Sequence, residues 1–481
     1  MKKITILIIL MLVSINMFSQ IIPIKDSQSN VLFGYVVFQK VEKVDRKTNS
    51  YMATLLDINL NRVSQAAFTD IDDIKVGNTL YNGNNIYFEV IPTNVSETFV
   101  PTTVFSYRIY DLKDNKISSR YELPNPDKKT VVRGSYAIHG KGFGVISRSI
   151  KTHVNEFQAF DDNNKPIYHT KPYGNPKKKK GWENIDVGDV QSGLLASISR
   201  KYPKSKSSDP RTTVLLTDAV TGKNIKEVSF DEDDYKVDLY NIQIIGDRIY
   251  AFGDTYTPKK ELNSGKTAGM FKAVMDLEGN VLHKKNAVWA ALQSKLDIKE
   301  GGFVKKNGYI YTHHYALDPE TNHTVVVGEY IKGGLSSVTV KDMVFMDFDE
   351  NFNLSQVFEV PTNKSVLSLG GIKMGGSRDY GKILKDYNYF DYRFANELEE
   401  SGGLSFFYFN VEKSRFFSNS EFSRGMVVYK DGKFSSNKLK YETNSWKNEH
   451  LNILPAKPGY ILVTKINKGQ LVENRLERLE Y

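Results

Sequence analysis

The side chains with the clearest chemical potential lie in one long segment, residues 365–405, which interrupts an otherwise regular sequence pattern. This segment carries an arginine followed by a series of tyrosines, namely Arg378, Tyr380, Tyr387, Tyr389 and Tyr392. Exposed tyrosines offer a large contact area and a hydroxyl group that can bond to sugars or peptide groups. The segment therefore predicts a binding surface for a carbohydrate or a protein ligand. The alternative is that it folds back and covers the edge of a sheet with its aromatic rings.

A second candidate is a basic run of four consecutive lysines at positions 177–180, followed closely by Trp182. Positive charge beside an indole can attract an anionic polysaccharide or a lipid headgroup, so Trp182 joins the candidate binding residues. The alternative is a solvated loop that the like charges keep extended.

Catalytic and metal-binding motifs are missing from the sequence. The chain has no cysteine, which excludes disulfides, thiolate nucleophiles and Cys-ligated metals. None of the eight histidines has the spacing of a metal site, and the neighbours His313 and His314 should face opposite sides of a predicted strand. An acidic run from Asp347 lacks the glycine and the glutamate of a calcium loop and predicts a turn. We therefore expect neither a metal nor a cofactor, and the sequence identifies no catalytic residue.

A repeated β-hairpin must position these candidates. Along the chain, a β-branched or aromatic run ends in Asp, turn-forming residues follow, and a second alternating run begins. Asp and Asn side chains bond to backbone amides two residues on, and Gly and Asn accept positive φ angles. Turn aspartates of this kind recur at intervals of 50–58 residues, at positions 57, 111, 161, 218 and 276. Four short strands with three turns occupy about this length.

The repeat therefore predicts an all-β β-propeller built from four-stranded antiparallel blades. Eight blades are favoured, with seven as the alternative. The short run 21–24 is expected to pair with the last unit, residues 451–481, and so to close the ring and satisfy its edges.

The N-terminal residues 1–19 are typical of a signal peptide. Lys2 and Lys3 precede an apolar stretch, residues 4–18, that is shorter than the roughly 20 residues of a membrane span. Cleavage is expected after Ser19; the alternative is an uncleaved anchor. The remaining residues, 20–481, are predicted to form one propeller domain with an insertion at 365–405. The protein is then exported, periplasmic or extracellular, and does not span a membrane after leader removal.

The net charge of +9 falls to +7 without Lys2 and Lys3, which is mild for this length. We expect no nucleic-acid partner.

Two segments with the residues Met275 to Val281 and Gly246 to Gly253 resemble blades of secreted β-propeller-like proteins of unknown function from Bacteroidota. The resemblance implies export and a propeller fold but no activity. The leading hypothesis is an exported, non-catalytic binding protein that recognises a carbohydrate, peptide or envelope partner through loops on one face. The alternative is an exported hydrolase or lyase whose carboxylates line the propeller channel. A structural component of the envelope is a third possibility.

Overall fold

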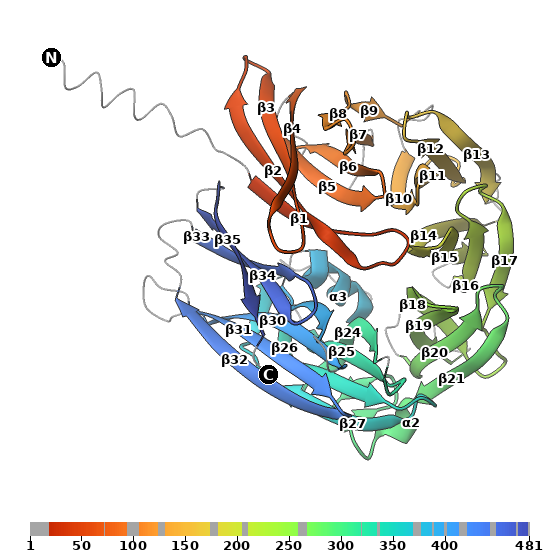
Figure 1. The fold of residues 1–481 in the computed structure, drawn as a ribbon. Coiled ribbons are helices and arrows are strands. Elements are labelled where there is room, and N and C mark those ends of the chain that lie inside the picture. The colour runs from red at the N-terminus through yellow and green to blue at the C-terminus, as the bar shows by residue number, and fades with distance from the viewer. Residues whose placement is uncertain are drawn as a thin grey trace.

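The computed structural model is an arrangement of sheets around a common centre (Figure 1). It describes residues 19–71, 73–93, 105–123, 130–173, 181–203, 210–257, 267–318, 320–333, 337–368, 377–386, 389–398, 402–412, 421–442, 449–467 and 470–479. The predicted signal peptide therefore lies outside the described residues, except for Ser19. In the described part, no helix is both long enough and apolar enough to cross a membrane.

The first four blades each pair their strands in chain order. Blade 1 holds β1 (Ser19–Lys25), β2 (Leu32–Lys43), β3 (Thr48–Leu56) and β4 (Arg62–Ile71). Blade 2 holds β5 (Ile74–Tyr81), β6 (Asn85–Pro92), β7 (Ser106–Asp111) and β8 (Lys116–Ile117), and β9 (Tyr121–Glu122) also pairs with β7. Blade 3 holds β10 (Thr130–Ile138), β11 (Gly142–Ser149), β12 (Asn155–Asp161) and β13 (Pro166–Tyr173). Blade 4 holds β14 (Trp182–Gln191), β15 (Leu194–Tyr202), β16 (Arg211–Asp218) and β17 (Asn224–Ser229).

The later blades are longer. Blade 5 holds β18 (Lys236–Ile245), β19 (Arg248–Tyr256), β20 (Gly269–Asp276) and β21 (Val281–Val288), followed by the short helix α2 (Trp289–Leu292). Blade 6 holds β22 (Ile298–Lys299), β23 (Phe303–Val304), β24 (Gly308–Leu317), β25 (Thr324–Gly333), β26 (Ser337–Phe348), β27 (Leu354–Val360) and β28 (Ser365–Ser368). Helix α3 (Ser377–Asp386) precedes blade 7, which holds β29 (Tyr392–Glu397), β30 (Leu404–Glu412), β31 (Glu421–Lys430) and β32 (Lys433–Glu442).

The preference for eight blades is wrong, because the ring has seven. The sheet that follows blade 7 has only three strands and is not counted as a blade: β33 (Glu449–Pro455), β34 (Tyr460–Asn467) and β35 (Gln470–Arg478). Residues 21–24 do not complete it, because they belong to β1, which pairs with β2 inside blade 1. The all-β propeller with four-stranded antiparallel blades is confirmed.

Packing closes the ring where strand pairing was expected. On one side of the three-stranded sheet, Leu462 lies in an apolar cluster with Ile21 and Tyr35 of blade 1. On its other side, Ile461 packs with Phe407 of blade 7. Similar clusters join neighbouring blades, so each sheet is stabilised mainly by the sheets beside it.

Aspartate side chains hold the turns between third and fourth strands, as the repeat predicts. The Oδ1 atom of Asp57 accepts hydrogen bonds from the backbone amides of Asn59 and Asn61, both at 2.8 Å. Asp276 accepts the amide of Asn280 at 2.7 Å, after Gly279 has turned through a φ of 79°. These bonds give the backbone amides of the turn their acceptors within a few residues. The connections between these strands can therefore be short.

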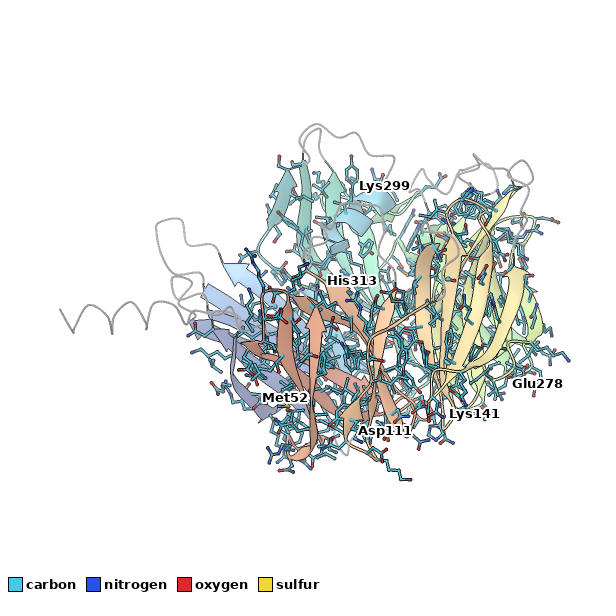
Figure 2. All side chains as sticks on the ribbon, turned by 90° about the horizontal axis from the view of Figure 1, so that it is seen from above. Met52, Asp111, Lys141, Glu278, Lys299 and His313 are labelled. Atoms are coloured by element: carbon cyan, nitrogen blue, oxygen red, sulfur yellow. The ribbon has the colours of Figure 1, made fainter. Side chains whose placement is uncertain are left out.

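The two faces of the ring consequently differ (Figure 2). On the turn face, short turns that carry Asp111, Lys141 and Glu278 connect strands within blades. On the loop face, where Lys299 lies, the connections between blades include α2, β22, β23, β28 and α3.

The first strand of most blades carries a β-bulge, with β24 as the equivalent strand of blade 6. The strand register shifts by one residue at Arg133, Gly188, Tyr240, His313 and Arg393, and β5 has an irregularity between Val76 and Thr79. A bulge re-aims the side chain that it leaves out of the ladder and is common beside functional sites. These strands lie around the centre of the ring (Figure 1).

Side chains on several first strands also connect neighbouring sheets. They bond to backbone groups of the next sheet: Gln20 to Val76, Asp189 to Ile244, Gln243 to Tyr315 and Asn396 to Tyr460. These bonds fix the angular position of the blades and of any side chain that the bulges present.

Candidate functional site

Two clusters of charged side chains lie in the half of the ring nearest the loop face. The arginine cluster comprises Arg133, Arg148, Asp186, Arg200 and Asp238, from blades 3 to 5. The carboxylate cluster comprises Glu329, Asp391, His313 and Arg393, from blades 6 and 7.

Asp186 on β14 is the centre of the arginine cluster. Its Oδ1 atom accepts a hydrogen bond from Nη2 of Arg133, at 2.5 Å, and its Oδ2 atom accepts one from Nη1 of Arg200, at 2.9 Å. Arg200 is held further by the carbonyl oxygen of Leu239, at 2.6 Å, and by Asp238, at 3.4 Å. Arg200 is thus fully engaged in joining blade 4 to blade 5.

Arg148 on β11 lies against the indole of Trp182. Its guanidinium carbon is 4.8 Å from the ring centre, and its Nη1 atom donates to the Oδ1 atom of Asn184. Trp182 in turn stacks on Tyr202 with 3.8 Å between ring centres and an angle of 6°. Burial, and then the nearby charge of Arg133, lowers the pKa of Arg148.

The arginine cluster carries more donors and more positive charge than its own partners satisfy. The Nε atoms of Arg133 and Arg148 are both buried and have no hydrogen-bond partner. A buried donor without a partner is rare and costs about 1–3 kcal/mol. Three guanidinium groups face two carboxylates. The cluster is also open to solvent, since the side chains of Arg133 and Asp186 are 28% and 26% exposed.

The carboxylate cluster is built around Glu329 on β25. Its Oε2 atom accepts the backbone amide of Asp391 at 3.1 Å, and its Oε1 atom accepts that of Tyr392 at 2.8 Å. The Nε2 atom of His313 lies 3.2 Å from Oε1. Glu329 therefore fixes the point at which the chain enters blade 7.

Asp391 has an unusual environment for a carboxyl group. Burial, and then the charge of Glu329, raises the pKa of Asp391 to about 7, although Nδ2 of Asn410 donates to its Oδ2 atom at 2.8 Å. Burial also lowers the pKa of Arg393, whose Nη1 atom donates to the carbonyl of Phe390 at 2.8 Å.

Aromatic rings seal the carboxylate cluster. Glu329 is 0% and Asp391 5% exposed, and the side chain of His313 is 7% exposed. Phe390 stacks on Tyr311 with 4.7 Å between ring centres and meets the ring of His313 edge-on at 4.5 Å. The cluster is enclosed as it stands.

The bulge at His313 changes the expectation for the histidine pair. Because the strict alternation of β24 is interrupted there, the rings of His313 and His314 both lie beside Tyr392, at 5.4 and 6.1 Å. Burial lowers the pKa of His314 to about 4. Among the described residues, no three His, Cys, Asp or Glu side chains form a group suited to a metal ion.

The structure places the predicted binding residues in three environments. Tyr380 and Tyr389 are half-buried and pack with Leu384 against β24 and β25. The hydroxyl of Tyr392 is buried without a hydrogen-bond partner, and burial raises its pKa. Trp182 lies beside the arginine cluster, at the start of β14 in blade 4.

In segment 365–405, residues 365–368, 377–386 and 389–390 pack onto blade 6, whereas Tyr392–Glu397 forms β29 of blade 7. Arg378 lies in α3, but its side chain, like Tyr387 and the lysines 177–180, is outside the described residues.

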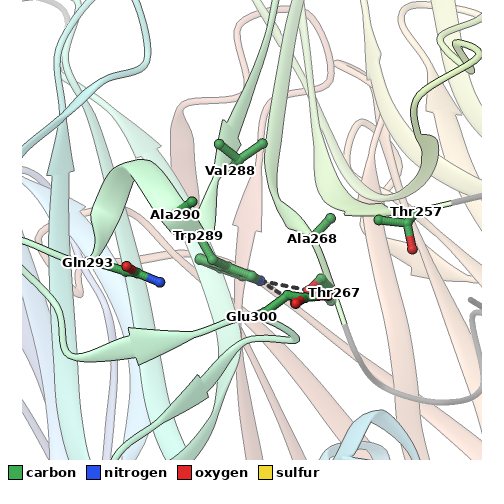
Figure 3. Close-up of a pocket in the computed structure, with 8 residues that line it drawn as sticks. All are labelled: Thr257, Thr267, Ala268, Val288, Trp289, Ala290, Gln293 and Glu300. Atoms are coloured by element: carbon green, nitrogen blue, oxygen red, sulfur yellow. Dashed lines mark hydrogen bonds between the residues drawn. The ribbon is translucent and has the colours of Figure 1, made fainter.

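A small pocket opens beside α2 (Figure 3). It has a volume of about 110 Å³ and is lined by Thr257, Thr267, Ala268, Val288, Trp289, Ala290, Gln293 and Glu300. The indole nitrogen of Trp289 donates to Oγ1 of Thr267 at 2.8 Å, so this polar group is already satisfied. Ligand pockets usually exceed about 300 Å³, and this pocket is too small to be the main site.

A family model matches the chain over residues 22–336 and 325–480. The protein belongs to DUF6770, a family of unknown function. No curated protein sequence matches this DUF6770 protein.

Solved structures that resemble this DUF6770 protein are distant. The WD40 domain of SCAP from fission yeast has a TM-score of 0.39 and 10% identity, covering 95% of this chain and 97% of that one. Dipeptidyl peptidase 4 of Porphyromonas gingivalis has a TM-score of 0.42 and 9% identity, covering 91% of this chain and 57% of that one. A subtype N11 neuraminidase-like protein of A/flat-faced bat/Peru/033/2010 (H18N11) has a TM-score of 0.32 and 9% identity, covering 88% of this chain and 96% of that one. These similarities are too distant to transfer a function.

Proposed function

We propose that this DUF6770 protein is an exported, non-catalytic binding protein that recognises a carbohydrate, a peptide or an envelope partner through the loop face. The observation that carries the proposal is the solvent-open arginine cluster, whose charge and buried donors exceed what its own carboxylates satisfy. The turn face supports the proposal by contrast, because its aspartates bond within their own turns.

The alternative, a hydrolase or lyase, has one supporting observation. Glu329 and Asp391 lie close together, and the pKa of Asp391 is raised to about 7, which suits a general acid or base near neutral pH. However, both carboxylates are enclosed and Glu329 is occupied by two backbone amides. A substrate would have to pass the rings of Tyr311 and Phe390 to reach them, so binding is the better supported function.

A direct test uses the full chain on a panel of immobilised neutral and acidic polysaccharides and purified envelope proteins. We expect one or more of these probes to bind the wild type, and Arg148→Gln to reduce that binding by about tenfold. The matched control is Arg248→Gln on the turn face, which removes the same charge from a half-exposed arginine beside Asp247.

Equal binding by the wild type and Arg148→Gln, or equal loss in both variants, would contradict recognition through the arginine cluster. If no probe binds the wild type, the binding function itself is overturned for these ligand classes.

A further inference from the structure

We infer that the arginine cluster is a binding site for an oxyanion group, a carboxylate, sulfate or phosphate, presented by the ligand. This inference rests on the proposed function and names the chemistry that its site recognises. It concerns Arg133 and Arg148 as the donors, with Trp182 beside them.

The first argument is the state of the two guanidinium groups. Each of them donates a hydrogen bond from a terminal nitrogen to a neighbouring side chain, Arg133 to Asp186 and Arg148 to Asn184. Each leaves its buried Nε–H without a partner. A planar guanidinium matches the spacing of oxyanion oxygens, and a bound oxyanion would supply the missing acceptors.

The second argument is electrostatic. Arg148 and Arg133 lie close enough for the charge of one to lower the pKa of the other, and burial acts in the same direction. Like charges that are held together in a partly desolvated place raise the energy of the empty site. An anion between them removes this repulsion, which favours the bound state.

The third argument is pre-organisation. Arg200 is fixed by Asp186, Asp238 and the carbonyl of Leu239, and so it holds the carboxylate that orients Arg133. The guanidinium of Arg148 lies over the ring of Trp182, which is itself stacked on Tyr202. The two donor groups therefore need little ordering when a ligand arrives.

The contact between Arg148 and Trp182 also provides the measurement. The intrinsic fluorescence of the full chain is recorded during titration with sulfate, phosphate or glucuronate, at constant ionic strength maintained with chloride. We expect a saturable change with at least one of the three, and the order of affinities identifies the preferred group. Trp182→Phe should abolish most of the change, since the chain contains only three tryptophans.

Variants decide whether the two arginines are the donors. Arg133→Gln and Arg148→Gln should each weaken the anion affinity by tenfold or more, and Arg248→Gln on the turn face should leave it unchanged. Arg148→Lys keeps the charge but loses the Nε–H donor, and so it should fall between the wild type and Arg148→Gln. Anion-dependent shifts in melting temperature give a second readout that does not depend on the indole.

The absence of a saturable response to all three anions would overturn the inference, as would a response that survives in Arg133→Gln and Arg148→Gln. The failure of the proposed function looks different. In that case, the small anions bind through the two arginines, but no polysaccharide or envelope protein of the panel binds the wild type.

Discussion

The arginine cluster and the carboxylate cluster have the same kind of scaffold and opposite accessibility. Each contains a side chain from a bulge in the first strand of a blade, Arg133 in one case and His313 in the other. In the arginine cluster these charges reach solvent, whereas rings of Tyr311 and Phe390 cover the carboxylate cluster. In both clusters the bulge positions a polar side chain. Whether a ligand can reach that side chain depends on the residues that cover it.

The two clusters also differ in how their charges are balanced. The oxygens of Glu329 are occupied by two backbone amides, so the acidic group acts as a structural anchor for β29. In the arginine cluster, two buried Nε–H donors are left without a partner. Unsatisfied donors in side chains that are partly exposed to solvent indicate binding, whereas satisfied acceptors in an enclosed place indicate structure.

The largest expected effect comes from Glu329→Ala. The substitution leaves the buried amides of Asp391 and Tyr392 without an acceptor, and we expect it to lower the free energy of unfolding by roughly 3–5 kcal/mol. Urea denaturation measures the change. Glu329→Gln, which keeps one acceptor oxygen, should lose less. A loss below about 1 kcal/mol for the alanine variant would show that the anchor is not structural.

A second prediction concerns pH. The pKa of Asp391 is raised to about 7 in the folded state, by burial and then by the charge of Glu329, with Arg393 and Asn410 acting in the opposite direction. The folded protein therefore retains a proton that the unfolded chain releases near pH 3.8. This contribution to stability is fully present below about pH 3.8 and is lost as the pH rises to about 7.

Asp391→Asn removes this titration, because the amide is neutral throughout. The free energy of unfolding of the wild type should fall more between pH 5 and pH 8 than that of the variant, by about 1.4 kcal/mol for each pH unit between pH 5 and the folded-state pKa of Asp391. Asp254, whose pKa burial raises to about 7, contributes equally to both proteins. Parallel pH dependences in the two proteins would mean that Asp391 titrates normally.

The sequence was sufficient for the architecture but not for the two clusters. The turn aspartates, such as Asp57 and Asp276, act within five residues, so their spacing revealed the blades. The blade number was wrong because β1 pairs with β2, and that choice depends on packing across the ring. Similarly, Arg133 and Asp186 are 53 residues apart and meet only through adjacent blades.

The tyrosine-rich segment 365–405 shows the same limit of prediction from sequence. Its composition suited either an exposed binding surface or a cover for a sheet. Helix α3 lies so close to β24 that a Cβ atom on Gly381 would be 2.1 Å from the ring of Tyr311. A contact between residues 70 positions apart has no local signature. Trp182 was visible in the sequence as an aromatic beside a basic run, but its partner Arg148 was not.

The smallest expected effect is on stability and comes from Arg148→Gln. The variant loses the contact with Trp182 and the bond to Asn184, but it also loses the repulsion from Arg133. At a partly exposed site these terms are each about 1 kcal/mol or less and have opposite signs, so we expect a net change below about 1 kcal/mol in urea denaturation. A destabilisation as large as that of Glu329→Ala would make Arg148 a structural residue. In that case, the difference in solvent access between the arginine cluster and the carboxylate cluster would no longer separate binding from structure in this ring.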